Sequence, residues 1–530
     1  MRFIKMRTEM KKRIVKVIFF FLLLMLIGSV AENVLKTPKN IEWNTEGMEN
    51  IKKSSNHYDV IFSGTSMALT NISVEELYIK YGVAGMSIGE PEQMVFLSYY
   101  ALENTLKYQS PKVVLFDTQA LFYSEESQKQ RIEENEEYYV HTTLDDIDDI
   151  KIKYEAVQQV KELHPTSNYA DYFSVLYHNH ANWENISQNN FIKEQGKDII
   201  LGNRNIAGIL ENVTNAEYIS EADNTGIKDS IPQINEIYLK KMSALCKEKN
   251  IDLVLIRSCG SKNWSWGQYN TVVELADELN IKYLDLAVNE DEIEFNWRTD
   301  TFDGNHHNVC GTKKWTDFLG RYLDENYYFA DKKNDRDYKE YEVYKEKYED
   351  ILNTMRTKIE LISAINFNQY LDTLLNLDKE GMAIFISIYD DASMNFSLIS
   401  QHYLSALGLN VDLMGKYRYS YYGILDNGKN IEELCNEEGG TKAGILDSGA
   451  EFEISSGGAL SDVGSSIKIN GIEYAQNGRG INIVVYDKKT DEILSSVYFD
   501  TFAEDNPSAC RIKNGVKQEE TDVNVWKDAD

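Results

Sequence analysis

The sequence predicts an α/β domain with a doubly wound parallel sheet, followed by a smaller β-rich domain and preceded by one transmembrane helix. Short apolar runs alternate with helix-like segments between residues 50 and 330, which is the pattern of strands and helices in a parallel sheet. A second series of apolar alternations fills residues 378–505. A charge-free apolar run lies near the N-terminus, after a basic segment.

The composition excludes several classes of protein. The chain has 530 residues, which indicates roughly two to four domains. Lys and Arg number 55 and Asp and Glu number 85, so the formal net charge is −30 and a constitutive nucleic-acid binder, which needs a basic face, is excluded. Hydrophobic residues at 42% and aromatic residues at 12% are enough for sizeable cores, which excludes a wholly disordered chain. Five cysteines, with no Cys-x-x-Cys motif and no Cys/His cluster, predict neither a disulfide scaffold nor a structural zinc site.

The N-terminal residues determine the predicted location. Residues 1–13 are basic, and residues 14–35 contain the charge-free run Val17–Ala31. Counted from residue 14, the apolar stretch is 18 residues long, because Lys16 can extend its ammonium group to the headgroups, and this length just spans a bilayer. Basic residues stay on the cytoplasmic side, so a single-pass anchor places the rest of the chain outside the cell. The alternative is a cleaved signal peptide, since Ser29-Val30-Ala31 resembles a cleavage site, and both alternatives export the protein.

The first domain, residues 50–330, contains a series of predicted strands and helices. Each strand is a short run of β-branched and large apolar residues. The predicted strands are His57–Ser63, Val83–Ile88, Val113–Asp117, Ile251–Ile256 and Ile281–Leu286. The predicted helices are Lys151–Leu163, Val272–Leu279 and Trp315–Tyr327, and the last of these closes the domain. An acidic, Tyr-rich stretch at 124–235 is inserted between the third and fourth strands.

The rest of the chain divides into a connector, a second domain and a tail. Residues 331–377 begin with a stretch dense in Lys, Glu, Asp and Tyr, which predicts a solvated helical connector. The second domain, residues 378–505, starts with the apolar alternation Met382–Ile388 and ends with a predicted hairpin-like pair of strands, Gly480–Tyr486 and Val497–Asp500. The polar residues 506–530 predict a frayed tail.

Ser66 directly follows the first predicted strand, within the turn Gly64-Thr65-Ser66. In a parallel sheet, ligands bind beyond the carboxyl ends of the strands. A serine at this position is therefore a candidate nucleophile, and Gly64 permits the tight turn. The alternative is structural, because a Gly-Thr-Ser turn after a strand is commonly the N-cap of a helix.

A second polar motif lies at the far end of the first domain, in residues 303–311. A serine nucleophile needs a base that accepts its proton, and that base needs an acid that fixes its tautomer. Asp303 and His306 can supply these groups, because they lie three positions apart in a Gly-containing loop before the last helix. The alternative is a polar loop that caps this helix. His307 competes with His306 as the base.

These two motifs resemble those of the SGNH/GDSL hydrolase superfamily, whose nucleophile lies in a Gly-x-Ser block after the first strand and whose Asp-x-x-His block precedes the last helix. The resemblance covers about residues 55–327, and the blocks are matched by Ser66, Asp303, His306, Asn308 and Gly311. Within the superfamily the chain is most similar to the membrane-anchored branch of alginate O-acetylation and D-alanyl transfer proteins. The resemblance implies a flavodoxin-like three-layer fold, with Ser66 as nucleophile, His306 as base and Asp303 as the acid that orients it. It implies no metal and no organic cofactor.

Two departures from the family pattern concern the oxyanion hole. The first block has Thr65 where the family more often has Asp or Ser, and Asp117-Thr118-Gln119 stands where the family has Gly-x-Asn-Asp. Each donor in such a hole lowers the barrier by about 3 kcal/mol, so another group must replace the missing Asn. The candidate donors are the Ser66 backbone N–H, Gly89, Gln93 and Gln119.

Aromatic and polar side chains at the same sheet edge are candidates for the substrate cleft. Trp264 and Trp266 lie in the polar loop after the fourth strand, and Asn308 continues the second block. The faces of aromatic rings pack well against the C–H surfaces of sugar rings, so the two tryptophans could bind a sugar. The alternative is that they are structural and hold the loop by packing. His178 and His180, in the insertion, are spaced for a metal only on a strand, whereas this stretch is predicted helical, so packing is the favoured interpretation.

The second domain carries a resemblance of its own. Met382–Ala392 ends in an Asp-Asp-x-Ala turn, and Gly478–Tyr486 contains Arg-Gly-Ile-Asn, followed by Phe-Asp-Thr at 499–501. These segments resemble interleukin-like EMT inducer (ILEI) domains over about residues 378–505. The resemblance implies a β-rich, sandwich-like module that binds carbohydrate, as related domains do in the stem of a protein-O-mannose glycosyltransferase. The candidate glycan contacts are Tyr389, Asp390 and Asp391, and the alternative is a spacer or oligomerisation module.

Together these features predict an exported, membrane-anchored serine esterase or acyltransferase that acts on O-acyl groups, O-acetyl above all, of a cell-surface polysaccharide. Water as acceptor makes the enzyme an esterase, and a sugar hydroxyl makes it a transferase. The expected partners are the polysaccharide, the membrane and a membrane-bound acyl-donor protein, with no nucleic acid. The alternatives are a non-catalytic carbohydrate-binding or assembly protein of the cell envelope, and D-alanyl transfer to a wall polymer.

Overall fold

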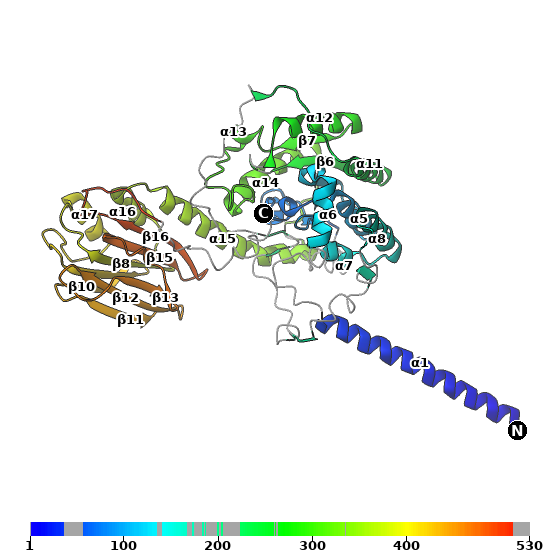
Figure 1. The fold of residues 1–530 in the computed structure, drawn as a ribbon, viewed down its shortest axis with the longest axis horizontal. Coiled ribbons are helices and arrows are strands. Elements are labelled where there is room, and N and C mark those ends of the chain that lie inside the picture. Colours follow the sequence, from blue (N-terminus) through cyan, green and yellow to red (C-terminus); the bar gives the residue numbers. More distant parts are fainter. Residues whose placement is uncertain are drawn as a thin grey trace. The chain divides into compact units, whose positions relative to one another are not determined.

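The computed structural model describes residues 2–35, 57–134, 140–166, 223–258, 263–333 and 335–511, together with Gly260 and a few residues between 172 and 204. The chain forms two compact units, Met1–Tyr348 and Glu349–Asp530, whose elements are labelled in Figure 1. The predicted cluster of His178 and His180 lies outside the described residues, as does the part of the predicted tail from 512 onward.

A parallel sheet forms the centre of the first unit. Its strands are β1 (Val60–Ser63), β2 (Gly85–Ser87), β3 (Val113–Asp117), β6 (Asp252–Arg257) and β7 (Lys282–Asp285). The strand order is β2-β1-β3-β6-β7, and every neighbouring pair is parallel. The α/β prediction for the first domain is therefore confirmed, and each predicted strand lies within two or three residues of its observed bounds.

Helices and short turns connect these strands. The longer helices are α5 (Val95–Thr105), α6 (Glu125–Glu134), α8 (Ile150–Leu163), α11 (Gln233–Glu248), α12 (Trp266–Leu279) and α14 (Val309–Asn326). The shorter ones are α3 (Ser66–Thr70), α4 (Val74–Glu76), η1 (Leu77–Tyr81), η2 (Gln119–Phe122), α7 (His141–Asp146) and α13 (Glu290–Ile293). Helix α5 packs against α8 and α11, and α12 packs against β7. Helix α14 starts earlier than predicted, because Asn308 caps it: Asn308 Oδ1 accepts the N–H groups of Cys310 and Gly311 at 3.0 and 3.2 Å.

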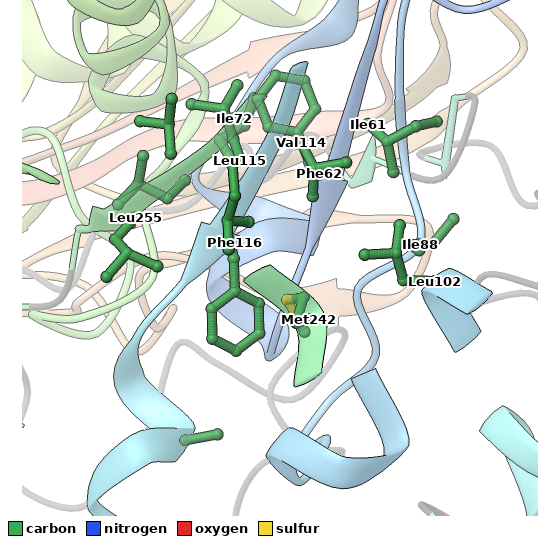
Figure 2. Packing of buried hydrophobic residues seen from close by; sticks show 14 of the residues in the cluster. Ile61, Phe62, Ile72, Ile88, Leu102, Val114, Leu115, Phe116, Met242 and Leu255 are labelled. Atoms are coloured by element: carbon green, nitrogen blue, oxygen red, sulfur yellow. The ribbon is translucent and has the colours of Figure 1, made fainter. Parts of the chain in front are cut away.

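The core of the first unit explains why the sheet forms. Every residue of β1 and β3 is buried, so both faces of these strands are covered and both faces are apolar. Figure 2 shows Phe62 of β1, Leu115 and Phe116 of β3, Leu255 of β6 and Met242 of α11 in this cluster. Burial of each such side chain stabilises the fold by about 2 kcal/mol relative to exposure.

The order of the strands fixes the edge where a ligand would bind. The chain places β2 on one side of β1 and then β3 on the other side, so the direction of strand addition reverses between β1 and β3. Ligands of open parallel sheets bind at such a reversal, beyond the carboxyl ends of the strands. Ser66 follows β1 and Gln119 follows β3, so both residues lie at this point.

The predicted connector, residues 331–377, is helical but is not simply solvated. It contains η8 (Arg336–Tyr338), α15 (Lys339–Ser363) and α16 (Phe367–Asn376). Tyr341 and Tyr348 of α15 are buried in the first unit, where their hydroxyl groups donate to the Gly85 carbonyl at 2.6 Å and to Glu76 Oε2 at 3.1 Å. The difference from the prediction arises because the apolar rings of these tyrosines pack inside while the charged residues between them face the solvent.

The second unit is built on a mixed β-sheet, as the prediction of a β-rich domain requires. Its elements are β8 (Met382–Asp390), α17 (Leu398–Ala406), β9 (Ser420–Asp426), β10 (Lys429–Asn436), β11 (Gly440–Ile445), β12 (Glu451–Gly458), β13 (Ser466–Ile469), β14 (Ile472–Glu473), β15 (Gly480–Asp487) and β16 (Glu492–Phe499). Strand β8 pairs antiparallel with β9 and β15, and its end pairs in parallel with β12. The predicted hairpin is confirmed as the antiparallel pair β15–β16.

The two faces of β8 belong to different clusters of buried residues. Ile384 and Ile386 pack with α16, through residues such as Tyr370, whereas Phe385 packs with Ile454 and Ile467 of β12 and β13. Successive side chains of a strand point to opposite faces, so one strand contributes to both clusters. Strands thus cover one face of this part of the sheet, and α16 and α17 pack on the other.

An apolar helix, α1 (Arg2–Leu35), begins the first unit and comes before its sheet, as predicted. Its segment Lys11–Ala31 has 21 residues and is long and apolar enough to cross a membrane. At about 1.5 Å per residue it measures about 32 Å, close to the thickness of a hydrocarbon core. Such a helix is consistent with a membrane anchor or with a signal sequence.

Candidate active site

The turn after β1 places Ser66 at the carboxyl edge of the sheet. Gly64 has φ +139°, and a Cβ at this position would lie 2.7 Å from Cβ of Asp117, so the turn passes too close to β3 for a side chain. Thr65 is extended and its hydroxyl accepts the Met67 N–H at 3.3 Å, which makes Thr65 the N-cap of α3. Ser66 is therefore the first residue of a helix, and 4% of its surface is exposed.

Ser66, His306 and Asp303 form one chain of hydrogen bonds. Ser66 Oγ lies 2.9 Å from His306 Nε2, and His306 Nδ1 lies 2.6 Å from Asp303 Oδ2. The other carboxylate oxygen, Asp303 Oδ1, accepts the backbone N–H groups of Asn305 and His306 at 2.9 and 2.7 Å. A carboxylate on Nδ1 favours the tautomer with its proton there, which leaves Nε2 free to accept the proton of Ser66.

The charge of Asp303 suits this arrangement. Burial acts to raise the pKa of Asp303, but the charge of His306 and the hydrogen bonds from His306 and Asn305 outweigh it and lower the pKa to about 2. Asp303 is therefore an anion at neutral pH, and it can stabilise the imidazolium that forms when His306 takes a proton.

His307 lies in a different environment from His306. It is fully buried, its Nε2 donates to the Ser258 carbonyl at 3.0 Å, and its ring packs 4.7 Å from that of Phe295. Burial lowers the pKa of His307 to about 3, so the ring is neutral at physiological pH. Of the two histidines, the structure brings His306 to Ser66, whereas His307 is packed into the protein.

A buried acid that the sequence motifs do not single out lies behind Ser66. Asp117 ends β3 and is fully buried, and its Oδ1 lies 3.2 Å from the Thr65 hydroxyl and 3.1 Å from the Gln119 N–H. Burial raises its pKa to about 6, against the opposing effects of the Gln119 N–H, the Arg257 charge and the Thr65 hydroxyl. The sequence contains one signal for Asp117: it is an acid at the end of an apolar strand, and such a residue can reach the edge of the sheet where ligands bind.

Arg257 and Asp285 extend this polar group along the sheet edge. Arg257 ends β6 and is buried, and Asp285 ends β7 and accepts hydrogen bonds from the Tyr283 hydroxyl and, at 2.9 Å, from Trp264 Nε1. Burial raises the pKa of Asp285, and the Tyr283 hydroxyl and the charge of Arg257 oppose this effect. The carboxyl ends of β3, β6 and β7 therefore all carry buried ionisable side chains.

The two predicted aromatic residues, Trp264 and Trp266, lie near the Ser66 turn but differ in exposure. Trp264 is buried and packs with Met67, the neighbour of Ser66. Trp266 is half-buried and lies 5.0 Å from the Trp264 ring in an edge-to-face contact. It is the first residue of α12 and not part of the loop, because the Ser265 side chain caps that helix by accepting the Gln268 N–H at 3.1 Å. Of the two, Trp266 keeps more of its surface for a substrate.

The predicted oxyanion donors have different surroundings. Gly89 lies against the Ser66 turn, but its N–H donates to Ser87 Oγ at 3.2 Å. Gln93 is buried, and its side chain donates to Thr143 at 2.9 Å and accepts from Ser98 at 2.8 Å. Gln119 is half-buried, with its Oε1 3.2 Å from the Thr65 hydroxyl.

Of the two glutamines predicted as donors, Gln119 is therefore the one that contacts the Ser66 turn. Asn308, predicted for the substrate cleft, is fully buried as the N-cap of α14, and its Nδ2 donates to the Thr299 carbonyl at 2.7 Å.

The predicted glycan contacts of the second unit lie at the end of β8. Tyr389 is 43% exposed and Asp390 has a left-handed backbone, with φ +64°. Asp391 is buried, and its carboxylate accepts backbone N–H groups, among them that of Ser393 at 2.7 Å, so its role in the structure is to hold the turn. Arg479, which the motifs did not single out as a contact, is exposed, pairs with Asp500 at 2.7 Å and lies 4.6 Å from the Phe502 ring.

His307 gives a pH dependence that stability measurements can isolate. Its pKa is about 3 in the folded chain against an ordinary value of 6.5, so below pH 6.5 the unfolded chain binds a proton that the folded chain does not. The stability that this group contributes is therefore complete above pH 6.5 and is lost as the pH falls towards 3. We predict that the unfolding free energy of the wild type, relative to His307→Gln, falls by about 2 kcal/mol between pH 6.5 and pH 5.

Urea unfolding followed by tryptophan fluorescence measures this difference, because Trp297 and Trp315 lie in the first unit. His402→Gln, an exchange at an exposed position of the second unit, is the control and should follow the wild-type curve. Parallel pH curves for the wild type and His307→Gln would contradict the assignment of a neutral buried ring.

No protein-family model matches the chain, and a search of curated proteins gives no match. What the first unit can do therefore follows from the geometry of the residues at its sheet edge.

Proposed function

We propose that the protein is an exported serine esterase or acyltransferase that acts on O-acyl groups of a cell-surface polysaccharide. The observation that supports this most is the hydrogen-bond chain from Ser66 through His306 to Asp303. Its members come from two turns 240 residues apart in the sequence that meet at the carboxyl edge of the sheet. A nucleophile, a base and an acid in this order are what acyl transfer requires.

The proposed reaction has two steps. Ser66 Oγ attacks the acyl carbonyl carbon while its proton passes to His306 Nε2, and Asp303 stabilises the resulting imidazolium. The carbon–oxygen bond to the sugar then breaks, the sugar oxygen takes the proton from His306, and the acyl group stays on Ser66 as an ester. In the second step water or another hydroxyl attacks this ester, with His306 again accepting and returning the proton.

The fold supports the resemblance to the SGNH/GDSL hydrolases. The strand order β2-β1-β3-β6-β7 is the order of flavodoxin-like doubly wound sheets, in which both faces carry helices. Ser66 after the first strand and Asp303 and His306 before the last helix of this unit take the places that the superfamily gives to its catalytic residues. The proposal needs neither a metal nor an organic cofactor, since the side chains named supply every proton transfer.

The proposed acyl group is acetyl, with D-alanyl transfer to a wall polymer as the variant that keeps the same residues. The acceptor decides between hydrolysis and transfer, and a membrane-bound acyl donor is the expected partner for transfer. A non-catalytic carbohydrate-binding protein of the cell envelope is the second candidate. The engagement of the Gly89 N–H by Ser87 Oγ favours this candidate, because it removes a donor from the oxyanion position.

The first prediction from this proposal concerns the nucleophile and the base. Ser66→Ala and His306→Ala should each lower turnover of p-nitrophenyl acetate by about four orders of magnitude or more, because the two residues act as a unit. Ser66→Ala should also abolish labelling by a fluorophosphonate, in which Ser66 Oγ bonds to phosphorus and fluoride leaves. The matched control is Ser63→Ala, at the end of β1, which should keep labelling. Wild-type turnover in Ser66→Ala would favour the non-catalytic candidate.

The second prediction concerns the N-terminal helix. We propose that α1 is a single-pass anchor with its basic end in the cytoplasm and both units outside. Protease added to intact cells should then digest the two units, and the undigested protein should sediment with membranes. Mature protein that starts near Glu32 and is free in the medium would instead identify a cleaved signal peptide.

The third prediction concerns the second unit, which we propose to bind the polysaccharide. Arg479 directly precedes β15, whose first residue, Gly480, pairs with Tyr389 of β8. Together with the Phe502 ring, these side chains offer charged and aromatic contacts for a sugar. Holding the polymer raises its local concentration at Ser66 without adding a contact there. Arg479→Ala should therefore raise KM for the polymer about threefold to tenfold and leave turnover of p-nitrophenyl acetate unchanged.

Lys442→Ala removes one exposed positive charge on β11 and is the matched control, with unchanged KM. An equal loss of polymer and small-ester activity in Arg479→Ala would indicate a structural role for the ion pair between Arg479 and Asp500.

A further inference from the structure

Asn71 follows α3, the short helix that begins with Ser66, and its side chain is fully buried. Asn71 Oδ1 accepts the backbone N–H of His307 at 2.9 Å. Asn71 Nδ2 lies 3.2 Å from the backbone carbonyl oxygen of Asn305, to which it donates. The first of these groups belongs to the peptide bond after His306 and the second to the peptide bond before it. One carboxamide therefore holds His306 from both sides.

The orientation of this carboxamide follows from its partners. A backbone N–H can only donate and a carbonyl oxygen can only accept. If the amide were rotated by half a turn, its NH2 group would face the His307 N–H and its oxygen would face the Asn305 carbonyl. Both contacts would then be repulsive, so the assignment of oxygen and nitrogen in Asn71 is determined by the two peptide groups.

Further bonds connect Asn71 rigidly to the helix of the nucleophile. Its backbone N–H donates to the Met67 carbonyl at 3.0 Å, and the Thr70 hydroxyl lies 2.8 Å from its Oδ1. Its Nδ2 also lies 3.0 Å from Ser258 Oγ, after β6. Asn71 thus joins three segments: α3, the end of β6 and the loop that carries His306.

The other hydrogen bonds of His306 have a different effect. Asp303 bonds to the ring and to the backbone N–H of His306, and the His306 carbonyl accepts the Phe302 N–H at 2.7 Å. These bonds lie within the 300–308 loop and move with it. The bonds of Asn71 cross from that loop to α3, on either side of His306 itself. They act together with the bond of Asn305 Oδ1 to the Gly260 N–H at 2.8 Å and the bond of the Thr312 hydroxyl to the Thr70 carbonyl at 2.9 Å, which hold neighbouring parts of the same segment.

We infer that Asn71 is the positioning residue that holds the base, His306, at hydrogen-bond distance from Ser66 Oγ. This inference rests on the proposed function, because it gives Asn71 its role through the proton transfer between these two side chains. Asn71 itself touches no reacting atom. Its loss would let the loop shift on α3, and a misplacement of about 1 Å at reacting groups costs about a hundredfold in rate.

The test compares Asn71→Ala with the wild type, both as full-length protein. Fluorophosphonate labelling gives two quantities: the fraction of molecules that react and the rate constant of the reaction. We expect the fraction to stay at the wild-type value and the rate constant to fall by about tenfold to a hundredfold. For p-nitrophenyl acetate, kcat should fall by the same factor while KM is unchanged. A merely structural role would lower the reactive fraction and leave the rate constant unchanged.

A double-mutant cycle supplies an independent readout. If Asn71 acts through His306, its removal should cost nothing further once His306 is alanine, so the losses in Asn71→Ala/His306→Ala should not add. Losses that add would overturn the inference. The matched control is Asn104→Ala, since Asn104 is also fully buried and joins α5 to the loop before α8, through its bond to the Asp149 N–H at 3.3 Å. That variant should lose stability and keep the labelling rate constant.

A second variant covers the case that Asn71→Ala does not fold. Asn71→Asp keeps the shape and the acceptor for the His307 N–H and replaces the donor that faces the Asn305 carbonyl, so its rate constant should fall in the same range. A wild-type rate constant in either folded variant overturns the inference, provided that Ser66→Ala still loses labelling and His306→Ala still loses turnover of p-nitrophenyl acetate. If those two variants label like the wild type, the proposed function itself is wrong.

Discussion

The hydrogen bond of 2.9 Å between Ser66 Oγ and His306 Nε2 is the contact on which the arrangement of the first unit depends. It joins two turns from opposite ends of this unit, so both turns must be fixed to the same sheet edge. The parallel pairing of β1 with β3 fixes the first turn, and the N-cap of α14 by Asn308 fixes the second.

Neighbouring side chains at this edge hold different charges because their surroundings differ. Asp303 is surrounded by donors and its pKa is lowered to about 2, whereas Asp117 is buried with fewer donors and its pKa is raised to about 6. His307, buried in an aromatic environment, has a pKa of about 3 and is neutral. Burial thus acts in opposite directions on acids and on histidines, and the local donors decide how far each group moves.

Much of the fold could be predicted from the sequence, since strands buried on both faces are continuous apolar runs. This holds for β1, β3, β6 and β15. Only the end of β16, from Val497, was predicted, because Ser495 and Ser496 interrupt its apolar residues. The start of α14 was predicted too late, because apolar periodicity begins at Trp315 whereas the helix begins at its polar cap, Asn308. The burial of Tyr341 was missed for a related reason: a stretch rich in charge conceals the few residues that face inward.

The candidate site was predictable where a local motif determines it and not where a distant partner does. The Ser66 turn and the spacing of Asp303 and His306 are local patterns, and the structure brings these three residues together. Asn71 has no such pattern, since what makes it important is the backbone of the loop that it meets across the sheet edge. Asp117 carries only a weaker signal, that of an acid at the end of an apolar strand. Distance along the chain also explains why the sequence did not reveal the partner of Gln93, whose side-chain amide donates to the Thr143 hydroxyl, 50 residues away.

The backbone of Gly64 restricts which substitutions this chain can accept. Its φ of +139° strains any other residue, and a Cβ there would press on Asp117 from 2.7 Å. A substitution would therefore disturb the Ser66 turn and the buried Asp117 together. Gly64 has no side chain and takes no part in any reaction. Its position nevertheless accepts no larger residue, because the neighbouring strand β3 already occupies the space that a side chain would need.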